Sequence, residues 1–468
     1  MIGQILLWWI WSTLLGLAVL PLVLRIFSRL PGRGLPFARP AGLLIAGYLY
    51  WLGSTFGVVN SDLGGALLAV FALAGLSWWL DRKRLRERLA ALRELRPLLL
   101  ISEVLFALAL VGWAFVRANN PEITGTEKPM ELAFLNAILQ SPHFPPHDPW
   151  LSGYAISYYY FGYVLLAFLT RLTGVVTGAA FNLGNSLWFA MAALGTYGLL
   201  YDLLSHRFKR PVIWAPLLGP VFVLLSGNLA GILEVLWSKH IFWKAGPEGL
   251  LHSGFWNWIG LEDLENPPLQ PASWLPTRYL WWWRGSRVIR DLNLLGVPIG
   301  LQSIDEFPFF SFLLADNHPH LLAMPFVLLT IAFVFQLFLA PNGLAQLSFH
   351  AIQPETKRQL TLAAVAGFFL LLAVRSVAAG GEALSATETF IHVLKGIVLY
   401  SLVLIALGAV LGVFRGVFPT FLTREEILAG AFLYGSLAFL NTWDLPIYFS
   451  LLMVVLFWKT DPLDLRSL

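Results

Sequence analysis

Two kinds of residue are scarce in this sequence of 468 residues: cysteine is absent, and charged residues make up only 12% of the chain. Without cysteine there can be no disulfide bonds, no thiol catalysis and no cysteine-bound zinc or iron–sulfur sites. Soluble domains carry about 25% charged residues. The net charge of +4 is small, and we expect it to reflect cytoplasmic anchors rather than nucleic-acid binding.

Signals for processing and repetition are also missing. The first ten residues have no basic region, and no small-residue cleavage site follows, so we expect no cleavable signal. The sequence contains no internal repeat and no low-complexity segment. We therefore take the chain as one set of non-repeated elements.

Apolar sequence is abundant instead. Hydrophobic residues make up 57% of the chain, and the mean hydropathy is +0.70. Many continuous runs approach the roughly 20 residues that cross a bilayer as a helix. We predict an all-α, polytopic transmembrane helical bundle of about 11–12 spans. The predicted spans lie near 4–24, 41–59, 63–80, 97–116, 157–175, 179–204, 211–228, 320–340, 359–379, 393–414, 427–440 and 446–458.

Basic residues predict the orientation of these spans. They follow the first and third spans, and further ones mark cytoplasmic ends of later spans, because cytoplasmic loops are enriched in Lys and Arg. The loops 118–156 and 232–308 then lie outside. We expect residues 1–96 to be accessory helices and 97–468 to be the functional core. The basic residues used are Arg25, Arg29, Arg33, Arg39, Arg82, Lys83, Arg84, Arg86, Arg88, Arg93, Arg96, Lys357, Arg358, Arg415 and Arg424.

One conflict arises between the two external loops. An even number of crossings must join them, yet three apolar runs lie between. One run should therefore be re-entrant or broken, and Gly219-Pro220 in the third run is the first candidate.

The loop 118–156 gathers the polar side chains that the rest of the chain avoids. We predict that Thr126 caps a short helix with Pro129 in its first turn. Glu127 and Glu131 are four residues apart and share one face of that helix. Leu132, Leu135 and Leu139 share another, as in an amphipathic helix lying on the membrane surface. A proline-rich turn with His143, His147 and Asp148 follows.

Three further polar clusters fall on the same predicted side. Charged groups near an apolar core cost about 2.5–3.5 kcal/mol each, so they are usually paired or functional. Each also has a structural interpretation: snorkelling arginines, a helix cap at Asp444, and hydrogen-bonded loop residues. Tyr158, Tyr159 and Tyr160 can form an aromatic belt, and Glu127 can be simply solvated. The clusters contain Arg284 and Arg287; Asp305, Glu306, Asp316, His318 and His320; and Asp444. A divalent metal at Asp316, His318 and His320 is an open alternative, and no other cofactor is expected.

Several motifs carry a resemblance to a known family. They are residues 126–131 (Thr-Glu-Lys-Pro-Met-Glu), 148–153 (Asp-Pro-Trp-Leu-Ser-Gly), 158–162 (Tyr-Tyr-Tyr-Phe-Gly), 305–312 (Asp-Glu-Phe-Pro-Phe-Phe-Ser-Phe), 318–320 (His-Pro-His) and 441–444 (Asn-Thr-Trp-Asp). From about residue 97 to near the C-terminus, the chain resembles the uncharacterised membrane family of bacteria and archaea named after its Tyr-Tyr-Tyr motif. The family's usual residue after Lys-Pro-Met is Asp, and this chain has Glu131.

That family in turn resembles the GT-C superfamily of membrane glycosyltransferases, which have an acidic residue in the first external loop. The resemblance implies a multi-pass plasma-membrane enzyme of a bacterium or archaeon, with its active face outside. By this analogy Glu127 is the catalytic base, and Asp148 orients the acceptor or a metal. The expected substrate-binding residues are Lys128, Glu131, Tyr158, Tyr159, Tyr160, Arg284, Arg287, Asp305, Glu306, His318, His320 and Asp444.

The expected partners are a polyprenyl-phosphate sugar donor and membrane lipids. Arginine binds a phosphate bidentately, and a carboxylate can take the proton of an acceptor hydroxyl. The absence of a glycine-rich phosphate loop argues against a soluble nucleotide-sugar donor. Two alternatives stay open: a transporter or lipid flippase, which acids at the bilayer centre would favour, and a non-catalytic envelope scaffold, which exposed apolar patches on 232–308 would favour.

Overall fold

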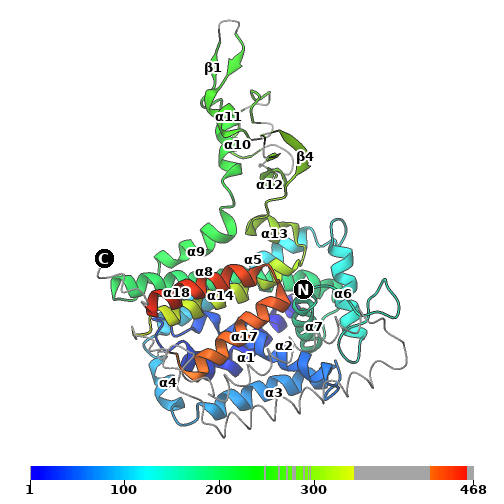
Figure 1. The fold of residues 1–468 in the computed structure, drawn as a ribbon, viewed down its shortest axis with the longest axis vertical. Coiled ribbons are helices and arrows are strands. Elements are labelled where there is room, and N and C mark those ends of the chain that lie inside the picture. Colours follow the sequence, from blue (N-terminus) through cyan, green and yellow to red (C-terminus); the bar gives the residue numbers. More distant parts are fainter. Residues whose placement is uncertain are drawn as a thin grey trace. The chain divides into compact units, whose positions relative to one another are not determined.

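The computed structural model describes residues 2–341 and 422–460, apart from short gaps at 247–248, 262–263, 270–271, 277–280, 288–289, 294 and 296. The described chain is predominantly helical, as predicted (Figure 1). The predicted spans 359–379 and 393–414, with Lys357, Arg358 and Arg415, lie outside the described residues.

Five described helices are long and apolar enough to cross a membrane. A sixth is counted if one bent pair forms a single span. The five are α1 (Ile2–Ile26), α3 (Leu63–Leu80), α5 (Arg96–Asn119), α8 (Thr177–Phe208) and α14 (Pro319–Phe338). The other predicted spans among the described residues form the helices α2 (Ala38–Thr55), α7 (Phe161–Thr173), α17 (Arg424–Leu440) and α18 (Asp444–Thr460), apart from the run 211–228.

The chain divides into two compact units. The first comprises Met1–Phe333 and Gly435–Tyr448, and the second comprises Val334–Tyr434 and Phe449–Leu468. Residues 1–96 thus belong to the same unit as the helices that follow them. An accessory role for residues 1–96 stays a prediction.

Helix α8 forms the centre of the first unit. In the most apolar stretch of α8, 78% of the residues are buried, whereas the corresponding share is 28% in α3 and in α5. Helix α5 packs along α8, where the ring of Trp113 stacks on Phe189 at 4.0 Å between centroids. The indole nitrogen of Trp113 donates to Oδ1 of Asn185 at 2.9 Å, which satisfies a polar group inside the apolar core.

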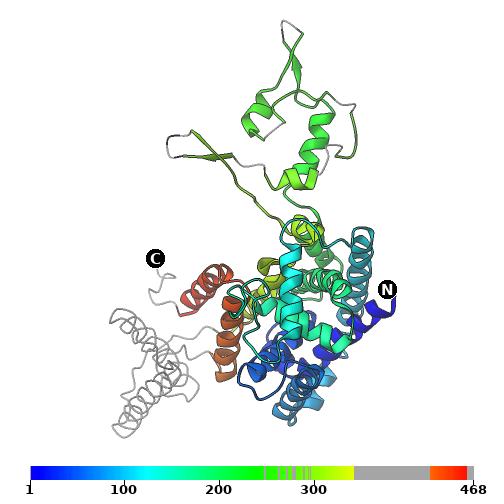
Figure 2. The ribbon, with the colours of Figure 1, turned by 90° about the vertical axis from the view of Figure 1, so that its right-hand side faces the viewer.

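Helices α1, α2 and α3 lie side by side (Figures 1 and 2). A 3₁₀ turn, η1 (Leu35–Phe37), leads into α2, and α4 (Leu85–Ala91) leads toward α5. Arg39, predicted to be a cytoplasmic anchor, is buried instead. It bonds both carboxylate oxygens of Glu103 at 2.7 Å and lies over the ring of Phe106. Pairing of this kind offsets the cost of burying a charge among apolar helices.

The third apolar run is broken, as the crossing count required. A 3₁₀ turn η2 (Ala215–Leu217), one turn of α9 (Leu218–Pro220) and a π-helical turn η3 (Val221–Leu225) precede α10 (Ala230–Ser238). The two halves meet at 77°. The bend therefore lies at residues 226–229, a few residues after Gly219-Pro220.

The segment after α10 folds into short helices and strands. It contains the antiparallel pair β1 (Lys244–Ala245) and β2 (Leu251–His252), the helices α11 (Gly254–Ile259) and α12 (Trp281–Gly285), and the antiparallel pair β3 (Arg290–Leu292) and β4 (Pro298–Gln302). A small core of Trp237, Trp256 and Leu264 holds its first part together.

The second unit is described for a few segments only. Thr423 and Glu426 cap α17 reciprocally: the carboxylate of Glu426 accepts from the backbone N–H of Thr423, and the Thr423 hydroxyl accepts from that of Glu426. The ammonium group of Lys459 donates to the carbonyl oxygen of Ala340 at 2.6 Å.

Candidate functional site

Helix α6 (Lys128–Gln140) carries the acidic residues of the predicted loop. Glu127 is its N-cap residue, and no side chain caps it. The prediction that Thr126 is the cap was wrong: Thr126 has φ of 50°, and its hydroxyl donates to Oδ1 of Asp316 at 2.7 Å. Of the predicted apolar face, Leu135 is buried and Leu132 and Leu139 are half-buried. The buried side chains of α6 are Lys128, Glu131, Phe134, Leu135 and Ile138, so the helix buries two charged residues together with three apolar ones.

Glu127, His318 and Glu131 form a chain of ionisable groups. Oε2 of Glu127 lies 3.4 Å from Nε2 of His318, and Oε1 of Glu131 lies 3.2 Å from Nδ1 of the same ring. The predicted shared face of the two glutamates is confirmed by this common neighbour. The Glu127 side chain is 51% exposed, whereas Glu131 is completely buried. The chain therefore connects an accessible carboxylate to an inaccessible one.

The environment favours the neutral form of the buried end of this chain. Burial and the nearby charge of Asp316 raise the pKa of Glu131 well above its ordinary value, against the backbone N–H of Asn317, which donates to Oε2 at 2.7 Å. Burial and the proximity of His320 lower the pKa of His318. Both shifts favour uncharged forms, as expected where water is excluded.

A second layer ties α6 to the segment that contains His318. The ammonium group of Lys128 donates to the carbonyl oxygen of Leu314 at 3.2 Å. Burial raises the pKa of Asp316, while the Thr126 hydroxyl and the charges of His318 and Lys128 oppose that rise. Burial also lowers the pKa of Lys128. These contacts join residues about 190 positions apart in the sequence.

His320 belongs to a neighbouring group on α13 (Pro308–Leu314) and α14. Its Nε2 lies 3.1 Å from Oε2 of Glu306, which also accepts from the Ser311 hydroxyl at 2.8 Å. Burial alone would raise the pKa of Glu306, but the hydrogen bond and charge of His320, with the hydroxyl of Ser311, lower it overall. Asp444 begins α18, accepts from the Asn441 side chain at 3.1 Å and interacts electrostatically with His320.

The geometry gives no support to a metal at Asp316, His318 and His320. These three side chains face different partners: Asp316 faces Thr126, His318 faces two glutamates, and His320 faces Glu306. Within the part of the chain that the structure describes, no group of three or more His, Cys, Asp or Glu side chains is arranged to hold a metal ion.

The three tyrosines border the site differently. Burial and the charges of Glu127 and Glu131 raise the pKa of Tyr158 to about 12, and its ring lies 5.7 Å from that of Phe134. The ring of Tyr159 contacts Tyr158. The hydroxyl of Tyr160 accepts from the Trp51 indole at 3.3 Å. Tyr158 is thus close to the acids, and Tyr160 is bound to α2.

Asp148 is not brought to the glutamates. Its Oδ1 accepts from the backbone N–H groups of Trp150 and Leu151, both at 2.8 Å, which shapes the proline-rich turn. It lines a cavity of about 550 Å³ with His147, Asn136 and Gln140. A helix turns 100° per residue, so Asn136 and Gln140 lie on the face of α6 opposite Glu131.

The two arginines lie on the tryptophan-rich segment. The Arg287 guanidinium stacks on the ring of Trp283 at 3.7 Å and donates to Oγ of Ser286 at 2.8 Å. The backbone N–H of Asp305 donates to the Ser286 carbonyl at 2.7 Å, and the charge of Glu306 acts on Arg287. Arg287 therefore approaches the group of Glu306 and His320, not Glu127 itself. Arg284 is exposed at the end of α12.

Sequence reasoning missed three members of the site. Asn317 and Ser311 donate to Glu131 and Glu306. Ser311 lies inside the motif 305–312, and Asn317 lies between Asp316 and His318, and these positions were the available signals. Tyr163, whose hydroxyl donates to Glu131 at 3.5 Å, lies within an apolar run and gave no signal.

The apolar helices, and the charged groups gathered beside them, define a multi-pass membrane protein. The chain belongs to the uncharacterized membrane protein family DUF2298, whose model matches residues 45–466. The match begins within α2, inside the predicted accessory segment. No curated protein and no solved structure matches the chain.

Proposed function

We propose that this protein is an integral membrane glycosyltransferase that uses a polyprenyl-phosphate sugar at the extracytoplasmic face of the plasma membrane. The chain of Glu127, His318 and Glu131 carries the proposal. A half-exposed carboxylate backed by an imidazole and a buried acid is suited to take a proton from a hydroxyl group. The order of an apolar helix, an acidic loop, a short helix and another apolar helix also agrees with the GT-C resemblance.

The reaction needs a base and a leaving group. The acceptor hydroxyl oxygen bonds to the anomeric carbon while the bond from that carbon to the phosphate oxygen breaks. The electron pair of the broken bond stays on the phosphate, and Glu127 takes the hydroxyl proton. The products are the glycosylated acceptor and the polyprenyl phosphate.

His318 and Glu131 position the carboxylate of Glu127 for this step. Oε1 of Glu131 lies 3.2 Å from Nδ1 of His318, and Oε2 of Glu127 lies 3.4 Å from Nε2, so a small rotation of the ring would let protonated Glu131 donate to Nδ1 and the N–H at Nε2 donate to Glu127. In this arrangement Glu131 and His318 have the uncharged forms that their pKa shifts favour. Such a chain fixes the imidazole tautomer and orients the carboxylate of Glu127.

Arg287 and Arg284 are assigned to the donor phosphate. Stacking of Arg287 on Trp283 leaves the guanidinium edge for a bidentate phosphate contact beyond Ser286. The Trp282 and Trp283 rings on the same segment offer flat apolar faces for a sugar or an isoprenoid chain.

The test is transfer of a labelled sugar from polyprenyl-phosphate donors by the full-length protein in proteoliposomes. Glu127→Gln should lower turnover about 10²–10⁴-fold, the usual contribution of a general base. Glu122→Gln is the matched control, because Glu122 is an exposed acid of the same loop whose carboxylate accepts from the Thr124 hydroxyl at 3.5 Å. Unchanged turnover in Glu127→Gln would overturn the proposal.

A non-catalytic envelope scaffold is the second candidate, and one observation favours it. The segment after α10 exposes large apolar side chains: Leu269 is 98% exposed, and Trp258 and Trp274 are each 81% exposed. Exposed apolar groups of this size often mark protein interaction sites. Loss of function on replacing Trp258 and Trp274, with none on Glu127→Gln, would favour the scaffold.

A further inference from the structure

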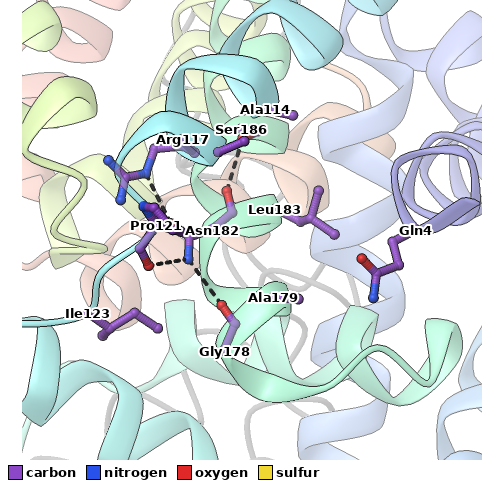
Figure 3. A pocket seen from close by; sticks show the side chains of 11 residues that line it. Gln4, Ala114, Arg117, Pro121, Ile123, Gly178, Ala179, Asn182, Leu183 and Ser186 are labelled. Carbon is purple, nitrogen blue, oxygen red and sulfur yellow. Dashed lines mark hydrogen bonds between the residues drawn. The ribbon is translucent and has the colours of Figure 1, made fainter. Parts of the chain in front are cut away.

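A cavity of about 590 Å³ lies among α1, α5 and α8, apart from the glutamate site (Figure 3). None of the residues that line it belongs to the Glu127, His318 and Glu131 chain. Its walls are largely aliphatic, formed by Ala114, Ala118, Ile123, Ala179 and Leu183. Such walls fit a hydrocarbon chain better than a polar solute.

Arg117 lines this cavity and is only 3% exposed. Its Nε donates to Oδ1 of Asn182 at 3.1 Å (Figure 3). The amide of Asn182 is itself fixed, because its Nδ2 donates to the carbonyl oxygens of Pro121 and Gly178. Among the described residues, Nη2 of Arg117 has no hydrogen-bond partner. The guanidinium is thus held in place with donor capacity left over.

The charge of Arg117 is also poorly compensated. Asp316 attracts it electrostatically, but no salt bridge joins Arg117 to any carboxylate in the described part of the chain. A buried cation without a close anion is unfavourable, because desolvation is not repaid. An anionic ligand in the cavity would supply the missing partner, and arginine matches the geometry of a phosphate group.

The position of the cavity points to a membrane lipid. Arg117 lies in the last turn of α5, whereas Gln4 and Gly178 lie in the first turns of α1 and α8. All three helices are long enough to cross a bilayer, and the ends of such helices lie at the level of the lipid headgroups. Lipid phosphates lie at that level, and an arginine there can form charge-assisted hydrogen bonds to their oxygens.

We propose that this cavity binds an anionic phospholipid, with its phosphate at Arg117 and one acyl chain against the aliphatic wall of α5 and α8. The inference does not depend on the transferase proposal. Free phosphate is disfavoured as the occupant, because it would leave the aliphatic wall uncovered.

Native mass spectrometry of the full-length protein in detergent tests the proposal, with phosphatidylglycerol and phosphatidylcholine as probes. The wild type should retain phosphatidylglycerol about fivefold more strongly, the ratio that corresponds to about 1 kcal/mol for one basic residue. Arg117→Gln should abolish this preference, and Arg117→Lys should keep much of it. Arg82→Gln should change nothing, because Arg82 is an exposed arginine that lies over the ring of Trp79.

A second variant guards against misfolding of Arg117→Gln. Ala118 is exposed and lines the cavity, so Ala118→Phe should fill the space and lower retention of both lipids. Equal retention of the two lipids by the wild type would overturn the proposal, as would an unaltered preference in folded Arg117→Gln. Competition by inorganic phosphate at the concentration of the lipid would show a free-anion site and would also overturn it.

Discussion

Glu131 is the residue whose chemistry differs most from what its type suggests. A glutamate is ordinarily charged and solvated, but this one is fully buried against Asn317, His318 and Tyr163. Its raised pKa means that the folded protein binds a proton more tightly than the unfolded chain does. The stability of the protein should therefore depend on pH through this side chain.

The sign of that dependence follows from the direction of the shift. The contribution of Glu131 is fully present below its unfolded value of about 4.5, and it is lost as pH rises toward the raised folded pKa. Glu131→Gln keeps an oxygen for the Asn317 N–H and removes the titration. We expect its Tm to rise relative to the wild type as pH increases from 5 to 8, measured by thermal unfolding in detergent.

Glu122→Gln is the control for this measurement. Glu122 is exposed in the same loop, so its replacement should leave the pH dependence of Tm unchanged. A wild type and a Glu131→Gln variant with parallel pH curves would show that Glu131 is not the buried acid described above.

At the scale of elements, the crossing of α1 and α2 depends on Gly42. A Cβ atom at this position would lie 2.1 Å from the carbonyl oxygen of Leu15, a backbone atom that cannot move without separating the two helices. Gly42→Ala should therefore destabilise the protein by about 1–3 kcal/mol, the usual cost of overpacking.

Gly112→Ala in α5 is the matched comparison. Nothing lies within 4 Å of a Cβ atom there, so alanine should be neutral or should stabilise the helix by up to about 1 kcal/mol. Thermal unfolding followed by fluorescence-detected size exclusion measures both variants. Equal Tm values for the two would contradict the close approach of α1 and α2.

Helix α6 shows why its orientation could not be predicted. The sequence pattern of Leu132, Leu135 and Leu139 predicted an amphipathic helix lying on the membrane surface, with its charged residues away from the apolar face. The structure also buries Lys128 and Glu131, because the segment at residues 314–318 supplies a carbonyl, an amide and an imidazole for them. Those partners are far away in sequence, so no local pattern could indicate them.

For the whole molecule, the absence of cysteine makes the predicted topology testable. The loop after α5 should be extracytoplasmic, and the basic segment before α4 should be cytoplasmic. Asn120→Cys should react with a membrane-impermeant maleimide in intact cells, whereas Arg84→Cys should react only after permeabilisation. Both positions are exposed, so accessibility within the protein does not limit labelling. Labelling of both from the same side would contradict the predicted orientation.

The sequence by itself determined the class of this protein and most of its helices. Apolar runs long enough to cross a bilayer are a local property, so α1, α3, α5, α8 and α14 were all predictable. The i, i+4 spacing of Glu127 and Glu131 was equally local. The break in the third run followed from counting crossings, although its position did not.

Only the tertiary structure decided which polar residues meet. His318 contacts both Glu127 and Glu131. Asp148 instead forms hydrogen bonds within the proline-rich turn. Arg117 lines a cavity that the sequence did not indicate. These arrangements depend on contacts between segments distant in the chain, and on which water-excluded space each charged group enters. Hydropathy and residue spacing contain no information about these long-range contacts or buried spaces, because both are properties of the local sequence.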